Sequence, residues 1–325
     1  YCFELYIMRV IDQIQNSDKT LFSFELLPPL KGNNIKRIYR VIDPLIEFNP
    51  SFINVTYHQE EVVYKKHPSG LLEKKTIRKR PGTVAISAAI KYKYPAVEVV
   101  PHLICGGFSK EDTENALIDF HYLGINNLLA LRGDPPKGIR NFIPEPDGHP
   151  YASGLVKQIT DMNNGKYLDE DLKNTTATDF CVGIAGYPEK HIESPNFAYD
   201  LKYLKEKIDA GAEYIITQMF FDNQSYFSFV KRCREAGITV PIVPGLKPVA
   251  TIQDINTLPQ IFNIDIPEDL VKEIQQCKSN KEAFRAGIEW TINQSKELIS
   301  FGVPVLHYFT IGISENIRQI ASAIY

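Results

Sequence analysis

The sequence predicts an α/β fold, a single-domain (β/α)8 TIM barrel, from three observations. Short runs rich in β-branched and other apolar residues recur eight times along the chain. Most of these runs are followed by a stretch with helical periodicity, and the last such stretch covers residues 314–324. Continuous apolar strands separated by single helices imply a parallel sheet that is covered on both faces. Eight such units match a closed barrel better than an open doubly wound sheet.

The eight predicted strands are spread over almost the whole chain. They cover residues 21–27, 52–57, 102–105, 126–131, 181–185, 214–220, 241–243 and 303–309. Residues 196–212 carry apolar side chains at helical spacing, which predicts an amphipathic helix. Ser109 and the acidic residues after it predict the N-terminus of another helix. The alternative is a Rossmann-type sheet, but no predicted strand is followed by the G-x-G-x-x-G phosphate-binding pattern.

Composition and charge exclude several classes of protein. The 325 residues are 44% hydrophobic and carry a formal net charge of −3 at pH 7, so nothing predicts a nucleic-acid or membrane partner. The five cysteines are scattered and form no C-x-x-C pair, which argues for a reducing compartment and against a zinc site. No apolar run approaches the roughly 18 residues of a membrane span. These features predict a cytoplasmic protein without a bound metal.

The first seven residues are predicted to lie outside the fold. Met8 and the three residues after it read like a native start, and residues 1–7 lack the basic-then-apolar order of a signal peptide. We therefore expect residues 1–7 to be a non-native or upstream extension, and residues 8–325 to form one barrel domain.

The residues at the strand ends are the candidates for chemistry, because barrel enzymes place their sites at the C-terminal ends of the strands. Glu25 stands among Phe and Leu neighbours, so its pKa should be raised, which suits a general acid. A salt-bridged Glu at the barrel rim is the alternative. After the fourth strand, the guanidinium of Arg132 could bind a phosphate through two hydrogen bonds. Gly133 permits close approach of a ligand, and Asp134 adds a negative charge. A plain turn would also explain these three residues.

Gln218 is the candidate for binding a planar heterocycle. Its amide could hydrogen-bond the ring while Phe220 and Phe221 stack on it. The alternative is a buried glutamine that bonds backbone groups. The hydroxyls of Thr56 and Tyr57 could likewise contact a cofactor or cap a turn.

Two long segments and one histidine complete the candidates. Residues 58–82 and 133–150 follow strand ends, and long loops in a compact domain are more often functional than idle. The basic run 74–80 reads as a solvated loop rather than a nucleic-acid site, because no aromatic platform interrupts it. His102 reads as a core residue, since no second His or Cys stands at metal spacing.

Eight segments in this order resemble the methylenetetrahydrofolate reductase family: FELLPP, NVTY, PHLIC, ALRGDP, YAS, AGYPEKH, DAGAEYIITQMFFD and PGLKPV. The resemblance runs from about residue 21 to the final helix and is to the catalytic domain alone. It implies FAD as cofactor, NADH or NADPH as co-substrate, and reduction of 5,10-methylenetetrahydrofolate to 5-methyltetrahydrofolate for methionine synthesis. It also implies a homo-oligomer, a dimer or a tetramer.

The resemblance assigns roles to particular residues. Glu25 matches the family's general acid, Asp134 the aspartate beside flavin and pterin, and Gln218 the glutamine on the pterin, with Phe220 or Phe221 stacking nearby. The positions that match FAD contacts, Asp134 among them, are Thr56, Tyr57, His102, Arg132, Gly133, Asp134, Tyr151, Ala152, Tyr187, His191, Asp200 and Lys207.

The sequence departs from the family pattern at one position that contacts folate and at two positions that contact FAD. Ile313 stands where many relatives carry an arginine that contacts folate, and Tyr203 and Glu206 replace an Asn and an Arg at FAD positions. Lys247 is the favoured substitute for the missing cation, and the basic run 74–80 is the other candidate.

Two rival functions remain at this stage. A pterin-binding barrel methyltransferase would need no FAD and no redox chemistry. A non-catalytic binding subunit would keep the cofactor as scaffold, but the presence of Glu25, Asp134 and Gln218 argues against it.

Overall fold

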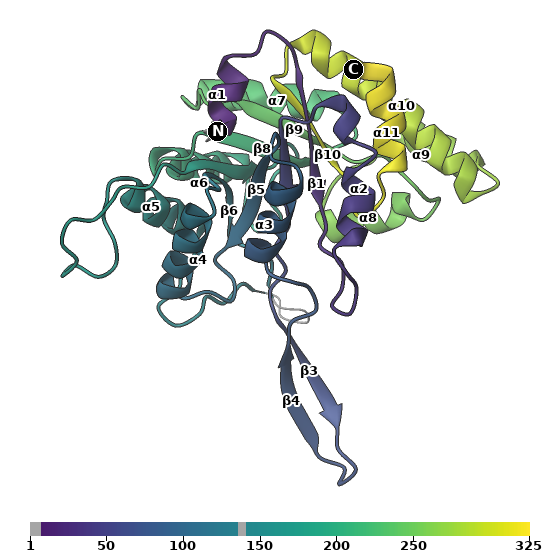
Figure 1. Ribbon diagram of the computed structural model, residues 1–325. Helices are drawn as coiled ribbons and strands as arrows, with labels where there is room; N and C mark the ends of the chain where they lie inside the picture. Colours follow the sequence, from purple (N-terminus) through teal and green to yellow (C-terminus); the bar gives the residue numbers. More distant parts are fainter. Residues whose placement is uncertain (1–7, 136–140) are drawn as a thin grey trace.

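Eight parallel strands close into a barrel in the order β1-β10-β9-β8-β7-β6-β5-β2, and helices cover its outside (Figure 1). The computed structural model describes residues 8–135 and 141–325, so the predicted extension, residues 1–7, lies outside the described residues. The barrel strands are β1 Leu21–Leu26, β2 Phe52–Val55, β5 Glu98–Ile104, β6 Asn127–Leu131, β7 Cys181–Gly186, β8 Tyr214–Met219, β9 Ile242–Leu246 and β10 Val305–Phe309. The predicted (β/α)8 barrel is confirmed.

Helices connect the strands, and two of them begin at the capping residues that the sequence predicts. Ser109 caps α4 through a capping box with Asp112, and the side chain of Asn196 caps α6. The helices are α1 Val10–Gln15, α2 Lys36–Ile42, α3 Thr83–Lys93, α4 Lys110–Tyr122, α5 Ala152–Asn163, α6 Phe197–Asp209, α7 Asn223–Glu235, α8 Asp254–Phe262, α9 Glu268–Gln276, α10 Asn280–Phe301 and α11 Glu315–Ile324, with a short 3-10 turn η1 Ile46–Phe48. No helix among the described residues is long and apolar enough to cross a membrane.

Alternation along the strands divides the core into an outer and an inner part. Outward side chains such as Phe24 and Ile53 pack under the helices in the largest buried cluster. A second cluster joins Phe52 and Val100 of the barrel strands to Val10 of α1. Because α1 precedes β1, it packs on the N-terminal end of the barrel. The opposite, C-terminal end is the one at which barrel enzymes place their sites.

Two strands have a bound that differs from the predicted one by more than two residues. β5 begins at Glu98, four residues before the predicted start, and β9 continues through Pro244 and Gly245, two residues that read as strand breakers. Gly245 is required there, because a Cβ at this position would lie 2.3 Å from the carbonyl oxygen of Thr217. Close packing of β9 against β8 therefore explains why a glycine occurs inside this strand.

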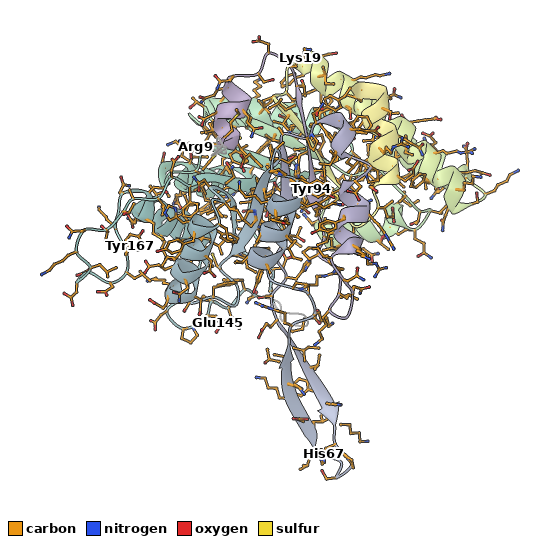
Figure 2. All side chains as sticks on the ribbon, in the orientation of Figure 1. Arg9, Lys19, His67, Tyr94, Glu145 and Tyr167 are labelled. Atoms are coloured by element: carbon orange, nitrogen blue, oxygen red, sulfur yellow. The ribbon has the colours of Figure 1, made fainter. Side chains whose placement is uncertain are left out.

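The segment 58–82, predicted to be a loop, contains an antiparallel hairpin formed by β3 Glu61–Lys66 and β4 Leu72–Ile77. The loop prediction was wrong here because neither face of the hairpin is buried, so its strands lack the apolar alternation of a core strand. The hairpin projects away from the barrel, with His67 near its far tip (Figures 1 and 2).

Candidate active site

Glu25 is a carboxyl group held out of water near the C-terminal end of β1. Its side chain is 17% exposed, and burial raises its pKa to about 8. Its Oε2 lies 3.3 Å from Nε2 of His102 on β5. Burial, followed by repulsion from His58, lowers the pKa of His102 to about 3, so this imidazole is neutral at pH 7. Glu25 is therefore mostly protonated at neutral pH and has a neutral partner.

A layer of polar side chains lies near Glu25 inside the barrel. The Ser23 hydroxyl and Nδ1 of His307 are 2.8 Å apart, and the His307 ring stacks on Phe52. Asn54 Nδ2 lies 3.3 Å from Nε2 of His102. Burial lowers the pKa of His307 to about 3, so the layer adds polarity without positive charge. Among the described residues, no group of three or more His, Cys, Asp and Glu could hold a metal ion.

The segment after β6 brings Arg132, Gly133 and Asp134 to the mouth of the barrel. Arg132 forms a bidentate pair with Glu193, with both N···O distances 2.6 Å. Gly133 has φ +86°, a conformation that glycine adopts without strain. Asp134 is exposed, and its backbone carbonyl accepts a hydrogen bond from Gln59. The predicted charges thus lie together at this strand exit.

Three predicted FAD residues line one recess between β7 and α6. Tyr187, Asp200 and Lys207 lie there together with Tyr203, one of the positions that depart from the family pattern. The Lys207 amine donates to the carbonyl oxygen of Ala185, and burial lowers the pKa of Lys207 to about 8 despite the attraction of Asp200. This recess offers a cation to an anionic ligand.

Other predicted FAD residues lie around the same end of the barrel. The His191 ring packs edge-on against Tyr187, with ring centroids 4.7 Å apart, and its backbone N–H donates to Asp200. The buried Thr56 hydroxyl has no hydrogen-bond partner. Tyr57 accepts a hydrogen bond from Arg78 at its hydroxyl. Tyr151 is exposed and precedes Ala152, the first residue of α5.

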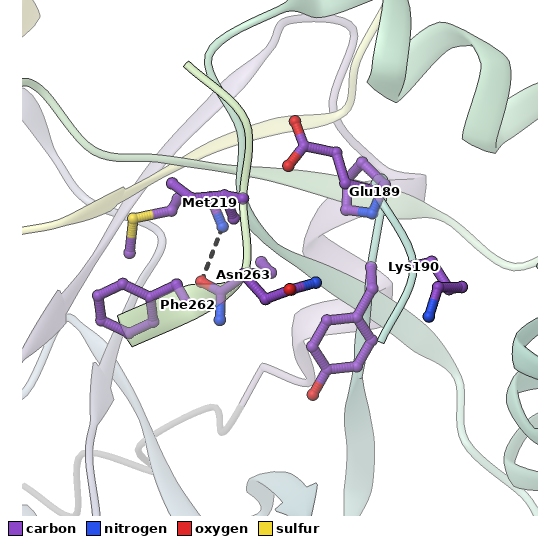
Figure 3. Close-up of a pocket in the computed structure, with 9 residues that line it drawn as sticks. Glu189, Lys190, Met219, Phe262 and Asn263 are labelled. Atoms are coloured by element: carbon purple, nitrogen blue, oxygen red, sulfur yellow. Dashed lines mark hydrogen bonds between the residues drawn. The ribbon is translucent and has the colours of Figure 1, made fainter. Parts of the chain in front are cut away.

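Gln218 lies in a second recess, between β8 and the end of α8. Figure 3 shows Phe262 and Met219 on one side of this recess and Glu189 and Lys190 on the other. The side-chain oxygen of Gln218 accepts a hydrogen bond from the backbone N–H of Met219, 2.9 Å away. Its amide nitrogen is therefore the group left for a ligand.

The two phenylalanines predicted to stack beside Gln218 lie elsewhere. Phe220 is fully buried and stacks on Tyr226, and Phe221 is buried in a third apolar cluster with Val249. The aromatic ring that lines the Gln218 recess is Phe262. Sequence reasoning missed Phe262 because it ends a helix and does not follow a strand.

Glu189 is a second residue that sequence reasoning missed. It lines the recess, and burial raises its pKa to about 7. One carboxylate oxygen accepts from the backbone N–H of Asp265, while the other is buried without a partner. Glu189 is part of the AGYPEKH segment. A glutamate among polar residues after a strand looks like an ordinary surface residue, so the sequence alone does not single it out.

The favoured substitute for the arginine that Ile313 replaces is not available. Lys247 is 7% exposed, and its amine donates to the carbonyl oxygen of Pro248 at 2.8 Å. Ile313 is 46% exposed beyond the end of β10. The prediction that Lys247 replaces the arginine therefore conflicts with its burial.

These features form one site. An acid with a raised pKa, a glycine turn flanked by an arginine and an aspartate, and two recesses lined with polar side chains occupy the C-terminal mouth of a closed parallel barrel. The fold and the site together define the class of (β/α)8-barrel enzymes, which bind substrates and cofactors at this mouth.

Comparison with known proteins identifies the family within this class. A family model described as Methylenetetrahydrofolate reductase matches residues 10–324. The chain belongs to the methylenetetrahydrofolate reductase family.

Individual relatives agree with this assignment. The chain is 31% identical over 322 residues to "Methylenetetrahydrofolate reductase (NADH) 1" of Arabidopsis thaliana, covering 95% of this chain and 49% of the relative. It is 31% identical over 296 residues to "5,10-methylenetetrahydrofolate reductase" of Escherichia coli, covering 90% of this chain and 86% of the relative. The chain thus spans about half the length of the plant protein.

A solved structure supports the fold. With a TM-score of 0.55 and 14% identity, the chain resembles an uncharacterized protein from Clostridium thermocellum that binds two copies of 5-methyl-5,6,7,8-tetrahydrofolic acid. The match covers 96% of this chain and 95% of that one. At this identity the likeness concerns the barrel alone.

Proposed function

We propose that this chain reduces 5,10-methylenetetrahydrofolate to 5-methyltetrahydrofolate, with FAD as bound cofactor and NADH or NADPH as co-substrate. The observation that carries the proposal is Glu25, an acid with a pKa of about 8 at the mouth of a barrel of this family. Relatives are named for NADH in Arabidopsis thaliana and for NADPH in Caenorhabditis elegans, which supports a nicotinamide co-substrate.

Glu25 acts as the general acid. Protonation of the nitrogen that bridges the methylene group opens the five-membered ring and leaves an electrophilic iminium carbon. A carboxyl with a pKa near 8 is protonated at neutral pH and can donate that proton. Neutral His102, 3.3 Å away, orients the carboxyl without ionising it. Removal of water around Glu25 by the bound ligand would keep its pKa high.

The residues around the mouth fit FAD. Lys207 and the Arg132 fork supply cations for its phosphates, Gly133 permits close approach of a ring, and the unpartnered Thr56 hydroxyl can bond a ring heteroatom. Asp134, exposed at the mouth, lies close enough to Arg132 to offset part of its charge. FAD, when bound, supplies a two-electron carrier between nicotinamide and folate.

The folate ring lies in the second recess. The Gln218 amide nitrogen donates to the pterin, and Phe262 supplies the stacking surface that was expected from Phe220 or Phe221. Asp134 would be the acceptor beside the flavin and the pterin, as the family resemblance implies. The product then supplies methyl groups for methionine synthesis. The chain acts in the cytoplasm and forms a dimer or a tetramer.

The first test is the colour of the purified protein. We expect a yellow protein whose flavin absorption is released by heat, and turnover with either nicotinamide. A colourless protein that transfers methyl groups from folate would contradict the proposal and favour the barrel methyltransferase.

The pH dependence of folate reduction should report Glu25. Because the protonated carboxyl is the active form, the rate is at its plateau below pH 8 and falls about tenfold per pH unit above it. Flavin reduction by the nicotinamide needs no such acid and should lack this limb. Stopped-flow measurement of both half-reactions from pH 6 to about pH 10 separates the two profiles. A limb shared by both would assign the pKa to another group.

A further inference from the structure

The hairpin β3–β4 and its stem concentrate positive charge in an otherwise acidic chain. Residues 58–80 contain seven Lys or Arg and three Glu, a net charge of +4. The whole chain has a net charge of −3, so the remainder carries −7. Segregation of this kind is typical of a surface that attracts an anion. None of the residues assigned to the candidate site lies on β3 or β4.

The register of the hairpin places its lysines on two different faces. Val63 pairs with Lys75 and Lys65 with Glu73, so the face that holds these residues and Glu61 balances its charges. On the other face, Tyr64 pairs with Lys74 and Lys66 with Leu72.

That second face carries two cations and no acid. It consists of Val62, Tyr64, Lys66, Leu72, Lys74 and Thr76, because paired residues and alternate residues share a face. Every one of these side chains is exposed, and neither lysine forms an ion pair with any described residue. We call this set the basic face; its Tyr64 and leucine can pack against the aliphatic part of a ligand.

The stem of the hairpin is fixed to the mouth of the barrel. Arg78 donates to the Tyr57 hydroxyl, Arg80 donates to the carbonyl oxygen of Pro28 just beyond β1, and Gln59 donates to the carbonyl oxygen of Asp134. The hairpin therefore projects from the rim of the barrel mouth, on the side of β1, β2 and β6 (Figure 1).

The other cations near the mouth have internal partners, and two of them, Arg132 and Lys207, are assigned to the FAD phosphates in the proposed function. Arg132 pairs with Glu193, and the amines of Lys190, Lys207 and Lys247 donate to backbone carbonyls. An anionic chain that leaves the site thus meets its unpaired positive charge on the hairpin.

We propose that the basic face binds the γ-linked glutamate tail of the folate substrate, an inference that rests on the proposed function. The tail bears one carboxylate per residue, so its charge complements the two lysines. Lys74 lies three rungs and Lys66 five rungs beyond Ile77, about 10 Å and about 17 Å along the strands. Several glutamates in series extend further along these positions than a single glutamate does, so the contribution of the basic face should grow with tail length.

The test compares two double variants of the full-length protein with equal charge change. One is Lys66→Gln with Lys74→Gln, on the basic face, and its matched control is Lys65→Gln with Lys75→Gln, on the balanced face. For each, the Michaelis constant is measured with the monoglutamate and the pentaglutamate of methylenetetrahydrofolate. Equilibrium binding of a p-aminobenzoyl pentaglutamate, which lacks the pterin, is the second readout.

We expect the basic-face variant to lower the preference for pentaglutamate about threefold to tenfold, as the loss of two exposed charge pairs implies, and added salt to lower it in the wild type. The control variant should keep the wild-type preference and the wild-type affinity for the pterin-free tail. Equal losses in both variants, or a loss in neither, would overturn the proposal. Absence of turnover with any folate in the wild type would instead refute the proposed function.

Discussion

Replacement of Glu25 by glutamine is expected to slow reduction of methylenetetrahydrofolate by about 10²–10⁴-fold, the usual loss when a general acid is removed. Glutamine is close in size to the protonated carboxyl and can keep the contact with His102, so the site should retain its shape. Reduction of the flavin by NADH or NADPH requires no proton donor and should stay within a few-fold of the wild-type rate.

The two half-reactions of the same variant serve as each other's control. Rapid-mixing absorbance under anaerobic conditions follows the flavin in both directions. Equal slowing of the two half-reactions would show that Glu25 supports the structure of the site rather than proton transfer.

Replacement of Lys207 by methionine should weaken FAD binding by about 10- to 100-fold, because a charged hydrogen bond contributes about 1.5–3 kcal/mol. Methionine keeps much of the side-chain volume but removes the charge. Burial lowers the pKa of Lys207 to about 8, so in the wild-type apoprotein FAD affinity should fall as the pH rises above about 8. In the variant this pH dependence should disappear.

Lys205 on the same helix provides the control for this prediction. It pairs with Asp209 on the outer surface, and Lys205→Met should leave the dissociation constant unchanged. Titration of apoprotein with FAD, followed by quenching of flavin fluorescence, measures both variants. Similar affinities for the Lys207 and Lys205 variants would place the phosphates away from the recess between β7 and α6.

The barrel was predictable because its strands are buried on both faces. Runs such as β2 and β6 are predominantly apolar and buried along nearly their whole length, which distinguishes them from the amphipathic helices between them. The hairpin β3–β4 was missed because solvent surrounds it and its sequence shows no periodic burial. Strand β9 was cut short at Pro244, since only the tertiary contact of Gly245 with Thr217 explains why breakers occur there.

The site was predictable where residues follow strands directly. Glu25 and Asp134 lie at strand exits as expected, and Gln218 lines a recess. The ring that stacks beside Gln218 was predicted wrongly, because the sequence does not show which way neighbouring side chains point. Phe220 and Phe221 turn into the packing between barrel and helices, whereas Phe262 reaches the recess from α8. The burial of Lys247 likewise depends on contacts across the fold.

The most direct test of the account is a sequential anaerobic experiment on one sample of the purified protein. NADH or NADPH is added until the flavin absorption near ~450 nm bleaches, a band that belongs to the cofactor's own ring system. After excess nicotinamide has been removed, 5,10-methylenetetrahydrofolate is added. The account predicts that the absorption returns and that 5-methyltetrahydrofolate forms in an amount equal to the flavin. A flavin that stays reduced after the folate is added, or a protein that binds no flavin, would contradict it.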